Sequence, residues 1–213
     1  MSIFLFIQIA FVCLLGAMSP GPSMVVVINN AIFKNKFNGI LTALGHGFGI
    51  GVYALFAVLG IGLVIETNII LFNIIKIVSI LFLFYLGVNS IFKINKLEFK
   101  KKDLIDSGQS FLQGLSISLL NPKILIWFIA IYSQFMSTDN ELYLNISLVL
   151  IASIVDALWY VFLVNLVTTG TIIEFIKNKS QYIQKIIGYI FITLKSVMLV
   201  SIIKPIPNTA NNA

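Results

Sequence analysis

Long apolar segments separated by short polar stretches divide the chain into six parts. Each segment holds roughly 20 or more mostly apolar residues, the length of helix that crosses about 30 Å of hydrocarbon. The pattern therefore predicts an all-α integral membrane protein with six transmembrane helices. The predicted spans are Ile3–Ile32, Gly39–Ile65, Ile69–Phe92, Phe111–Phe135, Leu142–Val167 and Ile186–Ile203.

Prolines interrupt the first and the fourth of these segments. The first break is the Ser-Pro-Gly-Pro-Ser sequence at 19–23, and the second is the Asn-Pro-Lys sequence at 121–123. Proline removes a backbone donor and clashes with the preceding turn, so each span must be kinked or split at its break. Irregular backbone at membrane depth persists only where it is buried in protein or lines a wet cavity. Two matched breaks therefore indicate a transport pathway.

The lysines predict how the chain is oriented in the membrane. Short cytoplasmic loops collect basic residues, and ten lysines fall in the first, third and fifth loops, whereas Lys204 is alone on the other side. Both termini are therefore expected outside the cytoplasm. With three spans in each half, the second half is inverted relative to the first, an arrangement common in secondary transporters. The predicted units are a first repeat at 1–92, a cytoplasmic linker at 93–108, a second repeat at 109–204 and a short tail at 205–213.

Two shorter segments carry further expectations. The first apolar stretch lacks a basic leader region and a clear small-residue cleavage site, so it is expected to remain as a span and not as a signal peptide. In the fifth loop, apolar residues beside lysines at 172–179 are compatible with a short interfacial helix on an anionic leaflet.

Composition supports the membrane class and excludes several others. Hydrophobic residues make up 59% of the chain and charged residues 10%, against about 45–50% and 25% in soluble domains. The net charge of +6 therefore reports topology, and no nucleic-acid partner is expected. Cys13 is the single cysteine, which excludes an internal disulfide and favours core packing. The sequence has no metal-ligand cluster, nucleotide-binding loop or nucleophile triad, so neither an enzyme nor a cofactor is predicted.

Asp156 is the strongest candidate for chemistry, because a charge at membrane depth is costly and usually faces a cavity or a partner. It lies near the middle of the fifth predicted span, and Ser153 and Tyr160 share its helical face. Lys123 lies about as deep in the fourth span. Two interpretations stay open: Lys123 and Asp156 form a structural bridge, or Asp156 binds substrate or a coupling proton.

Other ionisable residues have two interpretations each. His46 suits a proton relay, but a histidine packed in a helix and bonded to a carbonyl is more common. Lys76 lies near a span end, from which its side chain can snorkel to the interface. Lys195 lies nearer the middle of the sixth span, where a buried partner and snorkelling are equal alternatives.

Four alternating glycines mark the second span. They form two pairs spaced four residues apart, which let another helix approach closely. Packing within one chain is the first interpretation, with substrate contact to exposed backbone as the second, and the same faces also suit a homodimer. The glycines predicted to pack are Gly45, Gly47, Gly49 and Gly51.

These motifs together resemble the LysE/RhtB family of bacterial amino-acid exporters. The resemblance rests on Met-Ser-Pro-Gly-Pro at 18–22, on the glycine-rich sequence at 39–49, and on Leu-Asn-Pro-Lys at 120–123 running on to Ser-Gln-Phe at 133–135. Tyr-Leu-Gly at 85–87, Asp156 and Trp159 also fall where the family has similar residues. The chain departs from the family pattern at Ser79 and Lys195, where glycine is common.

The resemblance implies secondary export of small amino acids or similar zwitterions across the bacterial cytoplasmic membrane, driven by a proton or other ion gradient. The half-helix N-termini are expected to bind a carboxylate, while Asp156 takes the ammonium or a proton. Transport of another solute or cation and a non-transporting scaffold are the alternatives. The residues predicted to bind substrate are Pro20, Gly21, Pro22, Asn121, Pro122, Lys123 and Asp156.

Overall fold

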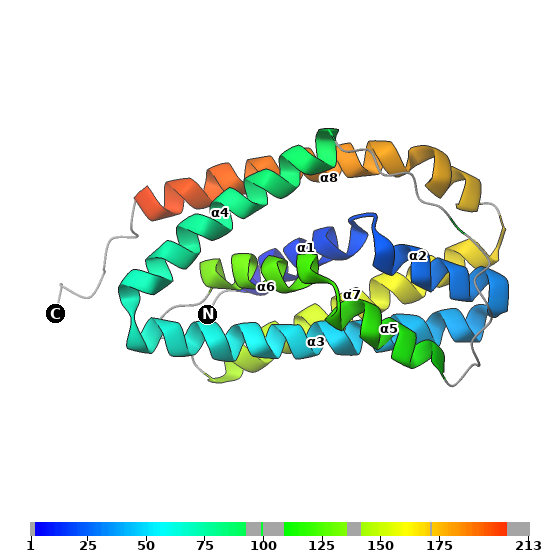
Figure 1. The fold of residues 1–213 in the computed structure, drawn as a ribbon, viewed down its shortest axis with the longest axis horizontal. Helices are drawn as coiled ribbons and strands as arrows, with labels where there is room; N and C mark the ends of the chain where they lie inside the picture. Colours follow the sequence, from blue (N-terminus) through cyan, green and yellow to red (C-terminus); the bar gives the residue numbers. More distant parts are fainter. Residues whose placement is uncertain (1–2, 93–98, 100–108, 136–141, 171, 204–213) are drawn as a thin grey trace.

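The computed structural model describes residues 3–92, 99, 109–135, 142–170 and 172–203, and every element formed by these residues is helical. The predicted all-α class is therefore confirmed. The predicted linker at 93–108, apart from Phe99, and the predicted tail at 205–213 lie outside the described residues. The elements are α1 (Ile3–Met18), α2 (Pro22–Asn29), the π-helical turn η1 (Asn30–Lys34), α3 (Lys36–Thr67), α4 (Ile69–Phe92), α5 (Gln109–Leu119), α6 (Pro122–Phe135), α7 (Leu142–Thr168) and α8 (Ile172–Ile203) (Figure 1).

Both predicted breaks are present. The axis bends by 71° between α1 and α2, and by 60° between α5 and the helix that follows it. Pro22 is the first residue of α2 and Pro122 is the first residue of α6. A helix tolerates proline at this position because the first amide has no partner inside the helix in any case. Each proline therefore starts a new helix at the point where it ends the old one.

Local hydrogen bonds satisfy part of the interrupted backbone. The Ser19 amide donates to the Gly16 carbonyl at 3.2 Å, and the Asn121 amide donates to the Ser118 carbonyl at 3.3 Å. The Tyr53 hydroxyl, from α3, donates to the Leu119 carbonyl at the end of α5. These bonds matter because an unpaired backbone group costs several kcal/mol in hydrocarbon.

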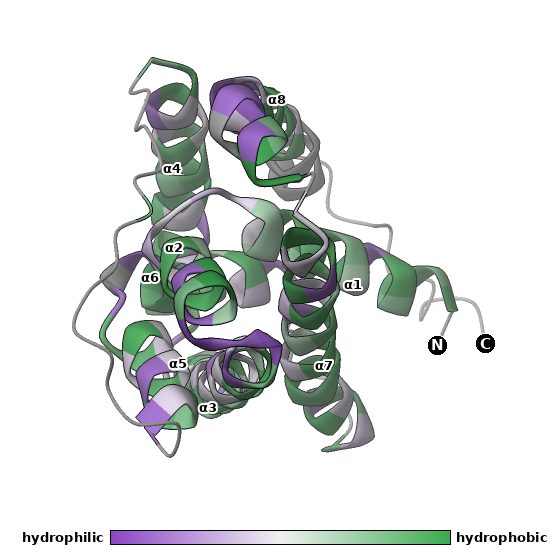
Figure 2. Cartoon of the chain, turned by 90° about the vertical axis from the view of Figure 1, so that its right-hand side faces the viewer, coloured by the Kyte–Doolittle hydropathy of each residue, from purple (hydrophilic) through white to green (hydrophobic). Residues whose placement is uncertain are grey.

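The described residues support three candidate membrane spans, or up to five if each bent pair is one span. The helices α3, α4 and α7 are each long and apolar enough, and the pairs α1–α2 and α5–α6 pass when each bent pair is taken together. Large apolar side chains such as Phe56 and Leu63, each 62% exposed, cover the outside of these helices. Figure 2 shows the same apolar cover, with hydrophilic residues gathered on part of α8. The predicted sixth span lies in α8, where side chains from 195 onward are outside the described part, so a six-span inverted repeat stays a prediction.

The short interfacial helix predicted at 172–179 is wrong. These residues are the first turns of α8, which runs without a break from Ile172 to Ile203. The buried face of α8 continues from Ile176 through Ser180 and Ile187 to Phe191, so the predicted interfacial segment packs as part of the same helix. The helix lies beside α4 (Figure 1). At their crossing a Cβ on Gly188 would lie 2.7 Å from the Gly87 carbonyl oxygen.

The helix α3 lies between α5 and α7 and contacts both. Its alternating glycines divide between these two neighbours. A Cβ on Gly45 would lie 2.0 Å from the Phe111 carbonyl oxygen, and one on Gly47 would lie 2.6 Å from the Ala157 Cβ. In the same way Gly49 faces Ser118 of α5 and Gly51 faces Ser153 of α7. Gly45 and Gly49 therefore allow close packing of α5, and Gly47 and Gly51 allow close packing of α7.

This packing predicts that Gly45→Ala destabilises the protein. The added methyl group would meet backbone atoms of α5, which cannot turn aside, and overpacking of this kind costs about 1–3 kcal/mol or more. Gly60→Ala in the same helix is the matched control, because a Cβ there meets nothing within 4 Å. It should be neutral or stabilising by about 0.5–1 kcal/mol. Denaturant titration of the purified protein in detergent measures both, and equal stability of the two variants would contradict the packing described.

Candidate functional site

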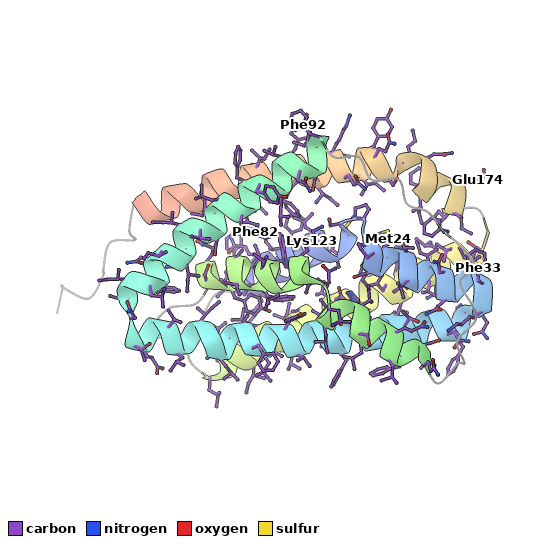
Figure 3. All side chains as sticks on the ribbon, viewed as in Figure 1. Met24, Phe33, Phe82, Phe92, Lys123 and Glu174 are labelled. Atoms are coloured by element: carbon purple, nitrogen blue, oxygen red, sulfur yellow. The ribbon has the colours of Figure 1, made fainter. Side chains whose placement is uncertain are left out.

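A cavity lies between the two breaks, with about 70 Å³ of space for the centres of water-sized molecules. One water centre needs about 10–15 Å³, so the cavity has room for a few waters or a small solute. Figure 3 shows Lys123 near the middle of the molecule, between α6 and the break before α2. The lining residues are Cys13, Gly16, Ala17, Ser19, Gly21, Pro22, Ser23, His46, Ile50, Asn121, Lys123, Ile124, Trp127, Phe128, Ala152, Asp156, Tyr160 and Phe191.

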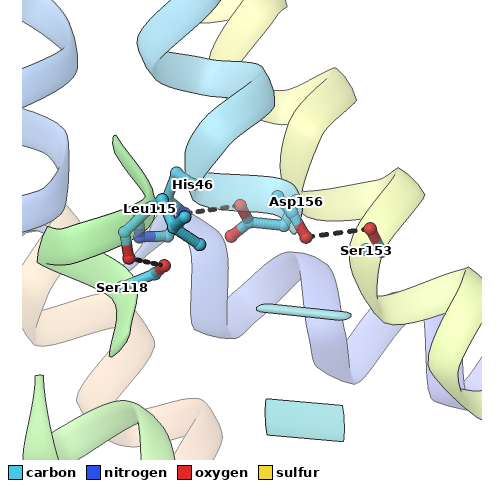
Figure 4. A network of polar contacts seen from close by, with 6 residues as sticks. His46, Leu115, Ser118, Ser153 and Asp156 are labelled. Carbon is cyan, nitrogen blue, oxygen red and sulfur yellow. Dashed lines mark hydrogen bonds and ion pairs between the residues drawn. The ribbon is translucent and has the colours of Figure 1, made fainter. Parts of the chain in front are cut away.

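Asp156 and His46 form a buried contact in the cavity wall. The His46 Nδ1 lies 2.6 Å from Asp156 Oδ2 (Figure 4). The two residues are 4% and 2% exposed. A carboxylate accepts a hydrogen bond, so Nδ1 is the donor, and this contact fixes the orientation of the ring. His46 is therefore the partner of Asp156 and is not bonded to a carbonyl through this nitrogen.

Close packing of α3 against α7 brings His46 and Asp156 within hydrogen-bond distance. Gly47 follows His46, and only the absence of a side chain there lets Ala157 approach. The Ser153 hydroxyl, one turn before Asp156, donates to the Gly47 carbonyl at 2.8 Å (Figure 4). The polar face predicted for α7 thus turns toward α3.

The second nitrogen of His46 is unused. Its Nε2 is buried and has no hydrogen-bond partner among the described residues. A buried polar atom without a partner costs about 1–3 kcal/mol, so such an atom in a native structure calls for an explanation. Because the ring lines the cavity, a solute or a proton there is a natural partner.

Lys123 connects the second break to the first. Its Nζ donates to the Ser19 Oγ at 2.9 Å, and its amide donates to the Asn121 Oδ1 at 3.1 Å. The Lys123–Asp156 bridge, one of the two interpretations that the sequence left open, is not formed among the described residues, where the carboxylate contacts His46 and the Lys123 ammonium contacts Ser19. Lys123 follows the start of α6, and from there its side chain reaches the loop after α1.

The two half-helices that begin at the breaks present different N-termini. In α6, the Asn121 side chain caps the Lys123 amide. In α2, Gly21 is the N-cap and no side chain caps the first turn. The amides of Ser23 and Met24 therefore have no intrahelical acceptor, and the helix dipole adds partial positive charge at this end. Of the two ends, α2 is better suited to bind an anionic group.

Aromatic and small apolar residues form the rest of the wall. Trp127 of α6 packs on Phe191 of α8 with ring centroids 4.9 Å apart. Gly16 lies against the Trp127 ring, where a Cβ would be 2.9 Å from Nε1. Cys13 is a buried free thiol in the same wall. The cavity thus joins a few polar groups to a mostly apolar surface, as small-molecule sites commonly do.

Five of the seven residues predicted to bind substrate line the cavity, namely Gly21, Pro22, Asn121, Lys123 and Asp156. Pro20 is not among the lining residues, and the Pro122 side chain lies outside the described part. Away from the cavity, the Lys76 ammonium lies 4.4 Å from the centroid of the Phe72 ring. The Lys195 side chain is outside the described residues.

The sequence did not single out several lining residues. Ser19 and Ser23 flank the Pro-Gly-Pro sequence, so their place beside a broken helix was an available signal. Trp127, Phe128 and Phe191 had no such signal, because aromatic residues occur all along apolar spans.

The family model for "LysE type translocator" matches residues 14–201. The chain belongs to the LysE type translocator family. The match includes both breaks and all but one of the cavity-lining residues, the exception being Cys13. The LysE relationship therefore applies to the part of the chain that builds the site.

Individual relatives of this LysE family chain agree with the match. The chain is 29% identical to the "Uncharacterized membrane protein YrhP" of Bacillus subtilis (strain 168), over 81% of this chain and 88% of the relative. It is 33% identical to the "Threonine efflux protein" of Escherichia coli (strain K12), over 64% of this chain and 68% of the relative. The threonine efflux protein of Salmonella typhi is 34% identical over the same shares. No solved structure matches the chain.

The buried contact predicts strong coupling between His46 and Asp156. Removing one partner leaves the other buried and unpaired, so His46→Leu and Asp156→Leu should each destabilise by about 3–5 kcal/mol. The double variant should cost less than the sum, with a coupling free energy of about 0.5–3 kcal/mol. Denaturant titration of the single and double variants in detergent measures this cycle.

The control cycle pairs His46→Leu with Glu66→Leu. Glu66 lies twenty residues further along α3, or about 30 Å at 1.5 Å per residue. These two changes should be additive within about 0.3–0.5 kcal/mol. Additivity in the His46–Asp156 cycle as well would show that the contact does not contribute to stability.

Proposed function

We propose that this protein exports small amino acids or similar zwitterions across the bacterial cytoplasmic membrane as a secondary transporter. The observation that carries the proposal is the cavity between the two breaks, which has a lysine and an aspartate in an otherwise mostly apolar wall. A zwitterion carries one carboxylate and one ammonium, so it offers a partner to each. The threonine efflux relatives favour amino acids over other zwitterions.

The two ends of the substrate are assigned by charge. The carboxylate is expected at the uncapped N-terminus of α2, close to Lys123, which already bonds to Ser19 in the same break. The ammonium is expected at Asp156. Charged hydrogen bonds contribute about 1.5–3 kcal/mol each, enough to hold a small substrate in a site that water can also enter.

The same groups favour substrates with uncharged side chains. Asp156 is the one acidic residue among the described residues that line the cavity, and the substrate ammonium uses it. A basic side chain on the substrate would find no second carboxylate to pair with among these residues. An acidic side chain on the substrate would find only one hydrogen-bond donor among the Trp127, Phe128 and Phe191 rings, the Trp127 indole. A side chain as small as that of threonine suits the limited volume.

Gradient-driven exchange through an inverted repeat is the transport mechanism that we infer. Pro22 and Pro122 each begin the second helix of a bent span. The two inverted repeats that contain these spans would rock against one another about the cavity. Both termini are expected outside the cytoplasm, as the lysine distribution predicts. One chain contains all the groups named here, so a monomer is the simpler unit and a homodimer remains the alternative.

Export itself is tested in Escherichia coli cells preloaded with a mixture of dipeptides, with mass spectrometry of every amino acid released. Cells with the intact protein should release one or a few neutral amino acids faster than cells without it. Asp156→Asn should lower this excess by at least about tenfold, because the ammonium loses its charged partner. Glu66→Gln makes the same chemical change at an exposed carboxylate and should leave the excess unchanged.

The comparison requires equal amounts of each variant in the membrane. Unchanged release from Asp156→Asn would remove the central residue from the mechanism. No excess release from the well-folded intact protein would favour another solute or a scaffold role.

A second prediction concerns the carboxylate end of the site. Lys123→Gln keeps a hydrogen-bond donor but removes the positive charge, so the amino-acid concentration for half-maximal exchange should rise by about 10-fold or more. Lys76→Gln is the control, because Lys76 lies on a phenylalanine ring of α4 and does not line the cavity. Counterflow in proteoliposomes measures both, and equal half-maximal concentrations for Lys123→Gln and the intact protein would contradict this assignment.

A further inference from the structure

We propose that His46 carries the coupled proton, and that the protonated imidazole and the substrate ammonium compete for Asp156. The inference rests on the proposed function and deepens it, because it names the group that links transport to the proton gradient. Mutually exclusive occupancy of one carboxylate is the physical basis of the exchange.

The geometry leaves one nitrogen of His46 for the proton. Nδ1 is bound to Asp156 at 2.6 Å, so Nδ1 keeps its hydrogen in both protonation states of the ring. Nε2 is buried and has no partner among the described residues. A neutral ring therefore has a lone pair at Nε2, and His46 is one of the residues that line the cavity. A proton that reaches the cavity binds there and turns the ring into a cation that stays in contact with the carboxylate.

The charges around the ring make Asp156 the contested group. The cavity-lining titratable residues are Cys13 from α1, Lys123 from α6, and Asp156 and Tyr160 from α7. The Tyr160 ring meets His46 edge-on at 4.9 Å. From α5, the residues that pack on α3, among them Phe111 and Ser118, bring no titratable group. The cavity-lining residues of α2 and α8 are Pro22, Ser23 and Phe191, which do not titrate either. Among the described residues that line the cavity, Asp156 is thus the one negative charge that can balance a cation.

The substrate carboxylate pairs with Lys123, so the imidazolium and the substrate ammonium both depend on Asp156, and one carboxylate cannot hold both cations in close contact. With a proton on Nε2, the imidazolium occupies Asp156 and opposes the substrate ammonium. With the ammonium on Asp156, the nearby positive charge opposes protonation of Nε2. Binding of the amino acid from the cytoplasm therefore expels the proton to that side.

The cycle balances without any further reactant. After the site opens to the outside, the amino acid leaves and a proton from the outside binds Nε2, and this loaded state returns to the cytoplasm. Only the Nε2–H bond forms and breaks. Each cycle moves one proton inward for one zwitterion outward, so the inward proton gradient drives export.

The alternative is that Asp156 alone takes the proton, and His46→Asn distinguishes the two. The Asn amide can still donate to Asp156 from about the position of Nδ1, but it cannot gain a charge. Ser153→Ala is the control, because it removes a different hydrogen bond between α3 and α7, that to the Gly47 carbonyl, and changes no titratable group. His46→Gln serves as a second variant if the asparagine protein does not fold.

The experiment uses purified protein in proteoliposomes with the 20 amino acids, ¹³C-labelled inside and unlabelled outside. Exchange of label at equal pH on both sides needs no net proton movement. Net transport driven by a pH gradient needs it, and a pH dye reports the accompanying proton flux. We expect His46→Asn to exchange as the intact protein does while its gradient-driven transport and proton flux fall by at least about tenfold. Ser153→Ala should keep all three.

Three results would overturn the inference. The first is gradient-driven transport with proton flux in His46→Asn. The second is loss of both exchange and coupling in folded His46→Asn and His46→Gln. The third is exchange by the intact protein without any net transport in response to the pH gradient. Absence of any amino-acid exchange by the intact protein would instead reject the proposed function, and the inference with it.

Discussion

The buried contact between Asp156 and His46 is the interaction on which the site depends. A carboxylate at membrane depth is costly unless it has a partner, and the partner here lies on a helix more than a hundred residues away in the chain, 2.6 Å from the carboxylate. Such a short distance requires α3 and α7 to pack closely. They can do so because Gly47 has no side chain where Ala157 approaches. On the opposite side of α3, Gly45 and Gly49 admit α5 equally closely. The imidazole itself is held by α7, through Asp156 and the Tyr160 ring.

The two proline breaks expose backbone polar groups that continuous helices would bond internally. A helix that crosses without interruption satisfies its own backbone and offers a polar solute nothing. Here the bends of 71° and 60° bring the start of α2 and the start of α6 to the cavity. The structure offsets the cost with Tyr53 on the Leu119 carbonyl and with Asn121 on the Lys123 amide. The first turn of α2 keeps its free amides, and Lys123 adds a positive charge beside them.

Much of the fold could be predicted from the sequence, because span length and proline breaks depend on local composition. The bounds of α4, Ile69–Phe92, agree fully, and both breaks occur where the prolines are. Asp156 could be identified as a candidate site residue because the sequence itself shows a charged residue inside an apolar segment. The partner of Asp156 could not, since a single sequence does not show which helices pack together. The direction of Lys123 and the continuity of α8 depend on packing in the same way. The orientation in the membrane and the sixth span stay predictions.

The most direct measurement is proton release when the purified protein binds its amino acid in weakly buffered detergent solution, followed with a pH dye. If the substrate ammonium and the protonated His46 compete for Asp156, binding should release up to one proton per site over the pH range in which His46 is protonated, and none from His46→Asn. Binding that is seen by calorimetry without proton release at any pH, or equal release from His46→Asn, would contradict the competition.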